Sequence, residues 1–256
     1  MTKLLVVGVD GAAWSVIKPN LDKLPYFAKL MREGKHKSLI VKEQVLSPSL
    51  WATIFSGKTL EEHKHSNFVI DGKLQVRDDI KVPFVWDLLE EKGIDVKALQ
   101  IPFIMPPYNF KCEYMPIGYG ASKNLNELEQ DTDAITEKAL GILKQNPEIF
   151  IVVFSALDKV QHFHWGEELV LGWYKKIDTA LGMLMGHAEK IIVVSDHGFC
   201  ARGEAKVQTL PEMSADGEKL KGDHHEEAIL ITKNINYEIR EHKGVFSAIM
   251  HEMGAE

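Results

Sequence analysis

The sequence contains little cysteine and no long apolar stretch. Its two cysteines, Cys112 and Cys200, lie far apart, which excludes a disulfide framework and favours a reducing compartment, so we expect a cytoplasmic protein. No segment approaches the roughly 18 consecutive apolar residues of a transmembrane helix. The apolar run near the N-terminus, Leu4–Val9, is too short for the core of a signal peptide and ends at an aspartate. We therefore expect a soluble chain that does not associate with a membrane.

A basic stripe, an internal repeat and a low-complexity segment are also missing. Lys and Arg together number 30 against 37 Asp and Glu, which gives a formal net charge of -7. Binding of a nucleic-acid polymer through its phosphates is therefore not expected. With 256 residues, of which 45% are hydrophobic, the chain can bury a full core, and no shift in composition marks a boundary. We predict a single domain over residues 1–256.

Three short apolar runs share one pattern, because each is rich in β-branched residues and leads to an acidic residue. These runs are Leu4–Val9 before Asp10, Ile149–Phe154 leading to Asp158, and Ile191–Val194 before Asp196. Continuous apolar runs of this length suit strands that are covered on both faces. Further strands are predicted at Ser38–Val41, Val96–Gln100 and Ala228–Thr232.

Between these runs, apolar residues recur at steps of three and four, which is typical of helices with one buried face. The predicted helices are Leu21–Glu33, Val85–Lys92, Leu125–Lys144, Glu167–Ala188 and Val245–Met253. Alternating strands and helices predict an α/β fold with a mostly parallel central sheet and helices on both faces. The stretch Pro102–Ala121 is expected to be an irregular loop or a small, reduced cap, and Arg202–Lys221 an exposed excursion.

The three aspartates that follow the apolar runs should lie together. Ligands of open α/β sheets bind outside the carboxyl ends of the strands, where Asp10, Asp158 and Asp196 are all expected. One such aspartate often only caps the next helix. Three carboxylates at one edge would repel one another unless a cation lies among them, so we predict a metal site.

Histidines accompany two of the aspartates. In the segment SDHGF at 195–199, Asp196 and His197 are adjacent at a strand end, where both can reach one ion. Asp158 and His162 are one helical turn apart and therefore share a face on which they can bind one metal. Taken singly, the first motif also fits a surface loop. The alternative role of His162 is a simple hydrogen bond to a nearby carboxylate, without a metal.

A third motif, GDHH at 222–225, forms a turn before a predicted strand, and either His224 or His225 could be a ligand. The predicted sets are Asp10, Asp196 and His197 for one ion, and Asp158, His162 and His224 for the other. Mixed nitrogen and oxygen ligands suit zinc best, with manganese or iron as alternatives. Two divalent ions a few ångströms apart can stabilise both the attacking and the leaving oxygen of a phosphoryl displacement.

A possible nucleophile precedes a helical segment at 46–57. Pro48 suits the first helical position, which would make Ser47 the N-cap. The N–H groups and the dipole at a helix N-terminus also favour an anionic phosphate. Coordination of Ser47 to a metal would lower the pKa of its hydroxyl and activate it. Ser49 is the alternative nucleophile, but it falls inside the first turn and is expected to face away.

These segments resemble, in the same order, the type I phosphodiesterase/nucleotide pyrophosphatase branch of the alkaline phosphatase superfamily. The resemblance covers most of the chain and rests on five motifs, which are VDG at 9–11, SPSLW at 47–51, Asp158 with His162, DHG at 196–198 and GDH at 222–224. It implies two zinc ions on the six residues grouped above and a covalent phosphoryl- or nucleotidyl-enzyme intermediate on Ser47.

Two positions after the nucleophile segment bear on this resemblance. The family usually has glycine after the histidine that matches His63, whereas Lys64 stands there. Asn67 falls near a family asparagine that holds a phosphate oxygen, so we predict a substrate contact at Asn67.

The leading hypothesis is a metal-dependent phosphodiesterase or pyrophosphatase that acts on a small-molecule phosphate ester or a nucleotide. The alternatives are a phosphomonoesterase or phosphotransferase of the same superfamily, and a non-catalytic nucleotide- or metal-binding module. A sulfatase is disfavoured, because the segment around Ser47 lacks the Cys/Ser-x-Pro-x-Arg pattern. Trp51, Phe68 and Tyr108 could stack on a nucleobase, although such residues more often pack in a core. The oligomeric state is left open.

Overall fold

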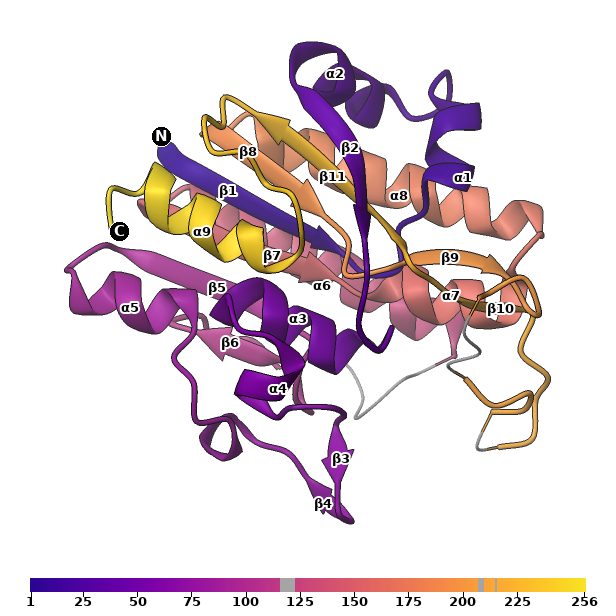
Figure 1. Ribbon diagram of the computed structural model, residues 1–256. Coiled ribbons are helices and arrows are strands. Elements are labelled where there is room, and N and C mark those ends of the chain that lie inside the picture. Colours follow the sequence, from indigo (N-terminus) through magenta and orange to yellow (C-terminus); the bar gives the residue numbers. More distant parts are fainter. Residues whose placement is uncertain (116–122, 207–209, 215) are drawn as a thin grey trace.

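The computed structural model describes residues 1–115, 123–206, 210–214 and 216–256. A seven-stranded sheet runs through its centre in the order β2-β11-β8-β1-β7-β5-β6 (Figure 1). The strands of this sheet are β1 (Thr2–Val9), β2 (Lys35–Ile40), β5 (Val96–Ile101), β6 (Tyr108–Phe110), β7 (Ile149–Phe154), β8 (Ala188–Val194) and β11 (Glu227–Lys233). All six predicted strands are present, with ends shifted by up to three residues.

The four central strands are parallel, and the edges of the sheet are antiparallel. β1 pairs in parallel with β7 and β8, and β5 pairs in parallel with β7. β11 pairs antiparallel with β8 and β2, and β6 pairs antiparallel with β5. The predicted α/β fold with a mostly parallel sheet is confirmed. The antiparallel edges were not predicted, because strand direction depends on how each connection crosses the sheet.

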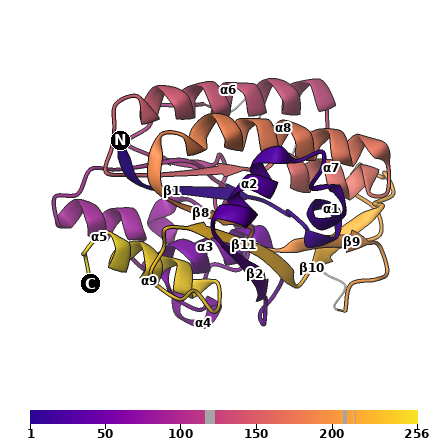
Figure 2. The same cartoon turned by 90° about the horizontal axis from the view of Figure 1, so that it is seen from above.

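Helices cover both faces of the sheet, as Figure 2 shows from above. One face is covered by α1 (Trp14–Ile17), α2 (Pro25–Glu33), α6 (Leu125–Leu143), α7 (Ala156–His164) and α8 (Glu168–Met185). The other face is covered by α3 (Ser47–Ser56), α5 (Val85–Glu91) and α9 (Lys243–Glu252), with α4 (Leu60–His63) against α3. Two short 3-10 helices span Lys18–Asn20 and Arg77–Asp79. No helix in the described ranges is long and apolar enough to cross a membrane.

The central strand β1 shows why its sequence is apolar without alternation. Leu5, Val7 and Val9 pack in the core beneath α2 and α8. Leu4 and Val6 pack in the opposite core beneath α3 and α9. Since successive side chains of a strand point to opposite faces, a strand that is covered on both sides must be apolar throughout. Each fully buried side chain of this kind contributes roughly 1.5–3 kcal/mol.

Two small sheets lie outside the main one. β9 (Gly198–Ala201) pairs antiparallel with β10 (Gly222–His225), and β3 (Val69–Ile70) pairs with β4 (Lys73–Leu74). Neither pair was predicted. β9 begins directly after His197, and β10 consists of the motif GDHH at 222–225. The ribbon that the two strands form therefore carries part of the candidate site.

The predicted loop Pro102–Ala121 is partly wrong. Tyr108–Phe110 forms the edge strand β6, and Phe103 and Ile104 are buried in the core. Residues 116–121 of this loop lie outside the described residues. In the predicted excursion, the described residues Gly203, Glu204 and Lys206 are exposed, whereas 207–209 and 215 again lie outside the described part.

Candidate metal centre

The candidate ligands lie at the carboxyl edge of the sheet. Asp10 directly follows β1, and Asp196 and His197 lie between β8 and β9. Asp158 and His162 come from α7, which starts two residues after β7 ends. His224 is contributed by β10. Three neighbouring parallel strands, β8, β1 and β7, thus deliver their following residues to one place.

The first predicted ligand set is compact and buried. Ligand atoms of Asp10, Asp196 and His197 all lie within 4.8 Å of one another. Nε2 of His197 lies 3.6 Å from Oδ1 of Asp10 and 3.4 Å from Oδ2 of Asp196. All three side chains are buried. The arrangement offers two carboxylates and one imidazole to a single ion.

The second set is equally close. Oδ1 of Asp158 lies 3.1 Å from Nε2 of His162 and 3.2 Å from Nε2 of His224. The two imidazole nitrogens are 3.3 Å apart. His224 also stacks on His197, with ring centroids 3.7 Å apart, so the two sets are contiguous. A grouping of Asp158, His197 and His224 is possible as well, since their ligand atoms also fall within 4.8 Å.

The charges of this cluster perturb its pKa values. Burial, followed by the negative charge of Asp158, raises the pKa of Asp196 to about 7. Burial and the charges of Asp196 and Asp158 raise the pKa of Asp10 well above its usual value. Burial alone would raise the pKa of Asp158, but the adjoining histidines outweigh it and hold that pKa well below its ordinary range.

The histidines respond in opposite directions. Burial, followed by the charge of His224, lowers the pKa of His197 well below its ordinary value. Burial also disfavours charge on His224, yet the adjoining carboxylate of Asp158, 3.2 Å away, outweighs it and raises the pKa of His224. A neutral imidazole beside carboxylates is the form that coordinates a metal.

The donor set fits divalent ions. Oδ1 of Asp158 and Oδ2 of Asp196 are buried, and neither has a hydrogen-bond partner among the described residues. The ring nitrogens near Asp158 lie close to its Oδ1 without the geometry of a hydrogen bond. An unsatisfied buried carboxylate oxygen costs free energy, and a bound cation would remove that cost. Mixed carboxylate and imidazole ligands suit zinc and manganese.

Ser47 lies beside the first ligand set. Its Oγ donates a hydrogen bond to Oδ1 of Asp10 at 3.2 Å and lies 3.1 Å from Nε2 of His197. The prediction that Ser47 is the N-cap is wrong, because α3 begins at Ser47 itself and Leu46 is the N-cap. The hydroxyl is turned toward the aspartate and the histidine.

The other residues that the sequence suggested lie elsewhere. Ser49 is fully buried, and its Oγ has no hydrogen-bond partner within the described chain. Of the two histidines left open, His224 joins the cluster, whereas Nδ1 of His225 accepts the N–H of Glu227. Asn67 is exposed, and its Oδ1 accepts the N–H of Phe68 at 2.8 Å, so its contact with a substrate stays a prediction.

The suggestion that Trp51 stacks on a nucleobase is wrong. Trp51 is fully buried, and its indole N–H donates to Oδ2 of Asp10 at 3.1 Å. Trp51 lies one helical turn after Ser47, so both side chains face Asp10 from α3, and this spacing was the available signal. Tyr108 packs against Trp86 with ring centroids 5.6 Å apart, as a core residue would.

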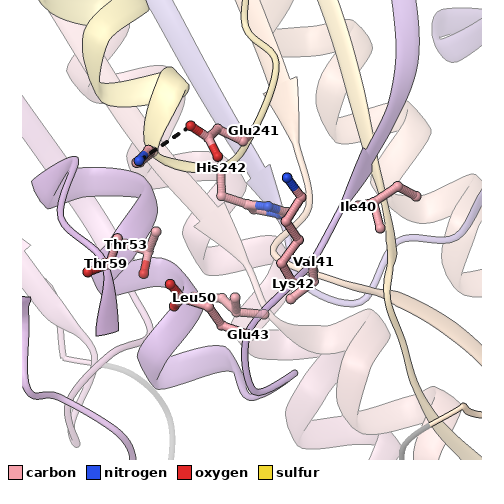
Figure 3. Close-up of a pocket in the computed structure, with 10 residues that line it drawn as sticks. Ile40, Val41, Lys42, Glu43, Leu50, Thr53, Thr59, Glu241 and His242 are labelled. Carbon is pink, nitrogen blue, oxygen red and sulfur yellow. Dashed lines mark ion pairs between the residues drawn. The ribbon is translucent and has the colours of Figure 1, made fainter. Parts of the chain in front are cut away.

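A small cavity of about 70 Å³ lies between the segment after β2, α3 and the start of α9 (Figure 3). Thr53 and His242 line it, and an ion pair between Glu241 and Lys243 spans 3.4 Å at its rim. Nε2 of His242 lies 3.3 Å from the carbonyl oxygen of Ser195. The residues that line this cavity do not include the predicted ligands, so it is separate from the metal centre.

The fold and the donor set define an α/β protein with a candidate two-metal centre beside a serine. The sequence pattern of the family described as type I phosphodiesterase / nucleotide pyrophosphatase matches residues 4–234. The chain therefore belongs to the type I phosphodiesterase / nucleotide pyrophosphatase family. Membership places it among the metal-dependent phosphoric ester hydrolases of the alkaline phosphatase superfamily. No curated protein matches the sequence significantly.

Solved structures share the fold. An inactive variant of murine ectonucleotide pyrophosphatase / phosphodiesterase 5, in complex with AMP, is similar with a TM-score of 0.69 at 14% identity, over 99% of this chain and 95% of that chain. Phosphonoacetate hydrolase from Sinorhizobium meliloti 1021, in complex with phosphonoacetate, is similar with a TM-score of 0.72 at 12% identity, over 98% of this chain and 96% of that chain. At these identities the likeness shows the fold alone.

Proposed function

We propose that the protein is a two-metal phosphodiesterase or pyrophosphatase in which Ser47 attacks the phosphorus of a small phosphate ester or nucleotide. The observation that carries the proposal is the position of Ser47 Oγ, within 3.2 Å of Asp10 and 3.1 Å of His197. Both residues belong to a buried ligand set with an unsatisfied carboxylate oxygen. A nucleophile in contact with metal ligands is what a covalent route requires.

Each residue has a role in this reaction. Asp10, Asp196 and His197 would hold one ion, and Asp158, His162 and His224 the other. Bound divalent ions supply charge that polarises the phosphate and lowers the pKa of a nearby hydroxyl. Zinc suits this donor set best, and manganese is the alternative.

Ser47 performs the substitution. Its Oγ donates to Asp10, which orients the hydroxyl toward the metal centre. As Oγ gives up its proton and bonds to phosphorus, the bond from phosphorus to the leaving oxygen breaks, and that oxygen keeps the electron pair and takes up a proton. Water then cleaves the phosphoserine and restores the hydroxyl. The N-terminus of α3 favours the anionic phosphate throughout, because its N–H groups and dipole point there.

The substrate class rests on the family and on the similar structures. The murine relative is in complex with AMP and the bacterial relative with phosphonoacetate, which are both small anions with a phosphorus centre. We therefore infer a small-molecule substrate, with a diester or pyrophosphate preferred to a monoester. The cytoplasmic location inferred from the cysteine content belongs to the same proposal.

A matched pair of serine variants tests the nucleophile. The protein is stripped with EDTA and reloaded with zinc or manganese, and hydrolysis of bis-p-nitrophenyl phosphate and p-nitrophenyl phosphate is measured. We expect Ser47→Ala to lose at least about 1,000-fold in kcat while it still binds two ions. Ser49→Ala, two residues away and without a hydrogen bond to lose, should retain activity.

Two outcomes would overturn the proposal. One is a wild-type protein that binds no metal and hydrolyses no phosphate ester. The other is full activity in Ser47→Ala, which would exclude the serine as the nucleophile. A higher kcat/KM for the monoester than for the diester would instead assign the phosphomonoesterase alternative.

A further inference from the structure

The turn that follows Asp10 is held by two buried polar side chains that the mechanism does not use. Nε2 of Gln161 donates to the carbonyl oxygen of Gly11 at 2.9 Å. The hydroxyl of Tyr174 accepts the N–H of Ala13 at 2.8 Å and donates to Oε1 of Gln161 at 2.9 Å. The three hydrogen bonds form one chain, which ties two helices, α7 and α8, to the backbone of a single turn.

Burial makes these hydrogen bonds consequential. Gln161 and Tyr174 are both fully buried, and a buried amide or hydroxyl without a partner costs about 1–3 kcal/mol. Here each group has a partner, so the pair is stable only when the turn is in its observed place. Apolar side chains of the same shape would fill the core equally well without that requirement. The polar atoms of Gln161 and Tyr174 therefore fix the position of the turn, and the packing of the core does not depend on them.

The turn itself touches both ligand sets. The N–H of Gly11 donates to Oδ1 of Asp196 at 3.3 Å, in the first set. A Cβ atom on Gly11 would lie 3.2 Å from the Cα of Asp158 and 3.2 Å from Nε2 of Gln161, beside the second set. Gly11 also has a φ of +68°, which L side chains rarely adopt. The backbone at Gly11 therefore lies so close to α7 that a larger side chain at this position would crowd the helix.

Gln161 is well placed to set the distance between the two ligand sets. It lies between Asp158 and His162 in α7, so it moves with the second ligand set. Its partner Gly11 directly follows Asp10, which belongs to the first set. A single hydrogen bond thus joins the helix that carries Asp158 and His162 of the second set to the turn that directly follows Asp10 of the first set.

We propose that Gln161 and Tyr174 are positioning residues that act as one unit and fix the separation of the two metal positions. The inference rests on the proposed two-metal function, but it assigns a role to residues that neither bind metal nor contact the phosphate. The separation matters because two ions must reach the attacking and the leaving oxygen of the same phosphate.

The test uses Tyr174→Phe, which removes only the hydroxyl, and Gln161→Met, which keeps the length of the side chain. Tyr114→Phe is the matched control, because its hydroxyl also donates to a side chain, Asp131, and neither residue is a predicted ligand. Each protein is loaded with Mn²⁺. The stoichiometry and the exchange coupling of the ions are followed by electron paramagnetic resonance, and kcat and KM for the diester are measured.

We expect both variants to bind two Mn²⁺ ions, since all six ligands remain. The coupling signal should differ from that of the wild type, and kcat should fall about 10- to 100-fold with KM within about threefold. The control should match the wild type in coupling and in kcat. Because the relay acts as one unit, the fall in kcat of the double variant should be no larger than the larger of the two falls in the single variants.

The outcomes separate this inference from the proposed function. A wild-type protein without a coupled pair of ions would overturn both. A coupled, active wild type with variants that keep the same coupling and a kcat within twofold would overturn only the positioning role. Losses that multiply in the double variant would also contradict it, because they would show two independent effects. If Tyr174→Phe does not fold, Gln161→Met decides alone, by the same coupling and kcat criteria.

Discussion

At the scale of single residues, the two oxygens of Asp10 have different partners. Oδ1 accepts the hydroxyl of Ser47, and Oδ2 accepts the indole N–H of Trp51. This division leaves the Ser47 side of the carboxylate facing the cluster and fixes the other side to α3. A ligand that is held by a hydrogen bond on its far oxygen keeps its orientation before a metal arrives.

Replacement of the indole tests this orientation. Trp51→Phe keeps an aromatic ring in the core but removes the donor to Asp10, so we expect about 10-fold weaker binding of the first ion and a fall in kcat of similar size. Calorimetric titration of the apoprotein with metal measures the affinity. Trp86→Phe is the control, because Trp86 is also fully buried and its indole nitrogen has no partner among the described residues. Equal losses in both variants would show that only packing matters.

At the scale of elements, the residue that directly follows α4 is strained. Gly57, the residue after α3, has a φ of 68°, and Lys64, the residue after α4, has a φ of 61°. Glycine adopts this left-handed conformation without cost, but a residue with a Cβ atom loses roughly 1 kcal/mol there. The family usually has glycine after the histidine. The left-handed backbone at Lys64 explains this preference, because a lysine there is strained and a glycine is not.

The strain at Lys64 predicts a stabilising change. Lys64→Gly should raise the free energy of unfolding by about 0.5–1 kcal/mol, since the relieved strain exceeds the added entropy of the unfolded glycine. Urea unfolding of the apoprotein measures the difference. Lys64→Ala removes the charge but keeps the Cβ atom, so it should bring no comparable gain. A gain of the same size in both variants would assign the effect to charge, and a loss in Lys64→Gly would contradict the strain.

The histidine before Lys64 joins the same two helices. Nε2 of His63 lies 3.0 Å from the hydroxyl of Thr53, and its Nδ1 accepts the N–H of His65. Since Nδ1 accepts, Nε2 carries the proton and donates to Thr53. Burial, followed by the charge of His65, lowers the pKa of His63 to about 4, so the ring is neutral at pH 7. His63 therefore holds α4 against α3 through hydrogen bonds rather than through charge.

At the scale of the whole molecule, the acidic cluster sets the response to metal and pH. Asp10 and Asp196 both have raised pKa values in the metal-free protein. A carboxyl whose folded pKa of about 7 exceeds its unfolded value stabilises the fold below pH 4, and this contribution is lost as the pH rises toward 7. A metal ion bound at this cluster would reverse the effect, because it would bind the charged carboxylates and displace the proton.

We therefore expect zinc or manganese to stabilise the apoprotein more at pH 8 than at pH 6. At a free metal concentration 100 times the Kd, binding contributes about 2.7 kcal/mol, which corresponds to a rise in Tm of about 5–10 °C. Thermal unfolding at pH 6, 7 and 8, with and without metal, measures the rise, and EDTA should abolish it. Asp196→Asn, which removes the titrating ligand, should show a much smaller rise. An increase in Tm that is independent of pH would contradict the coupling between protons and metal.

Local patterns in the sequence were enough to predict the centre of the fold. The apolar runs of β1, β7 and β8 identify strands that are buried on both faces, because only such strands avoid polar residues on every side. The small strands β6, β9 and β10 were missed, since they have three or four residues and no apolar periodicity. β9 and β10 form only because they pair with each other across residues 202–221, and β6 forms because it adds to the edge strand β5.

The sequence by itself determined which residues end the central strands and which pairs share a helical face. Asp10, Asp196 and the pair Asp158 and His162 follow from those patterns, because strand ends and helical spacing are local properties. Their role as metal ligands stays a prediction, as does that of Ser47 as the nucleophile.

Only the tertiary structure decided how these residues meet. It brings His224 rather than His225 to the cluster, places the N–H of Trp51 on Asp10, and joins Gln161 to the turn at Gly11. Gln161 and Gly11 are 150 residues apart, and His224 and His162 are 62 apart. Such contacts depend on the order of strands in the sheet and on the pairing of β9 with β10, which are set by packing of the whole chain and leave no local pattern.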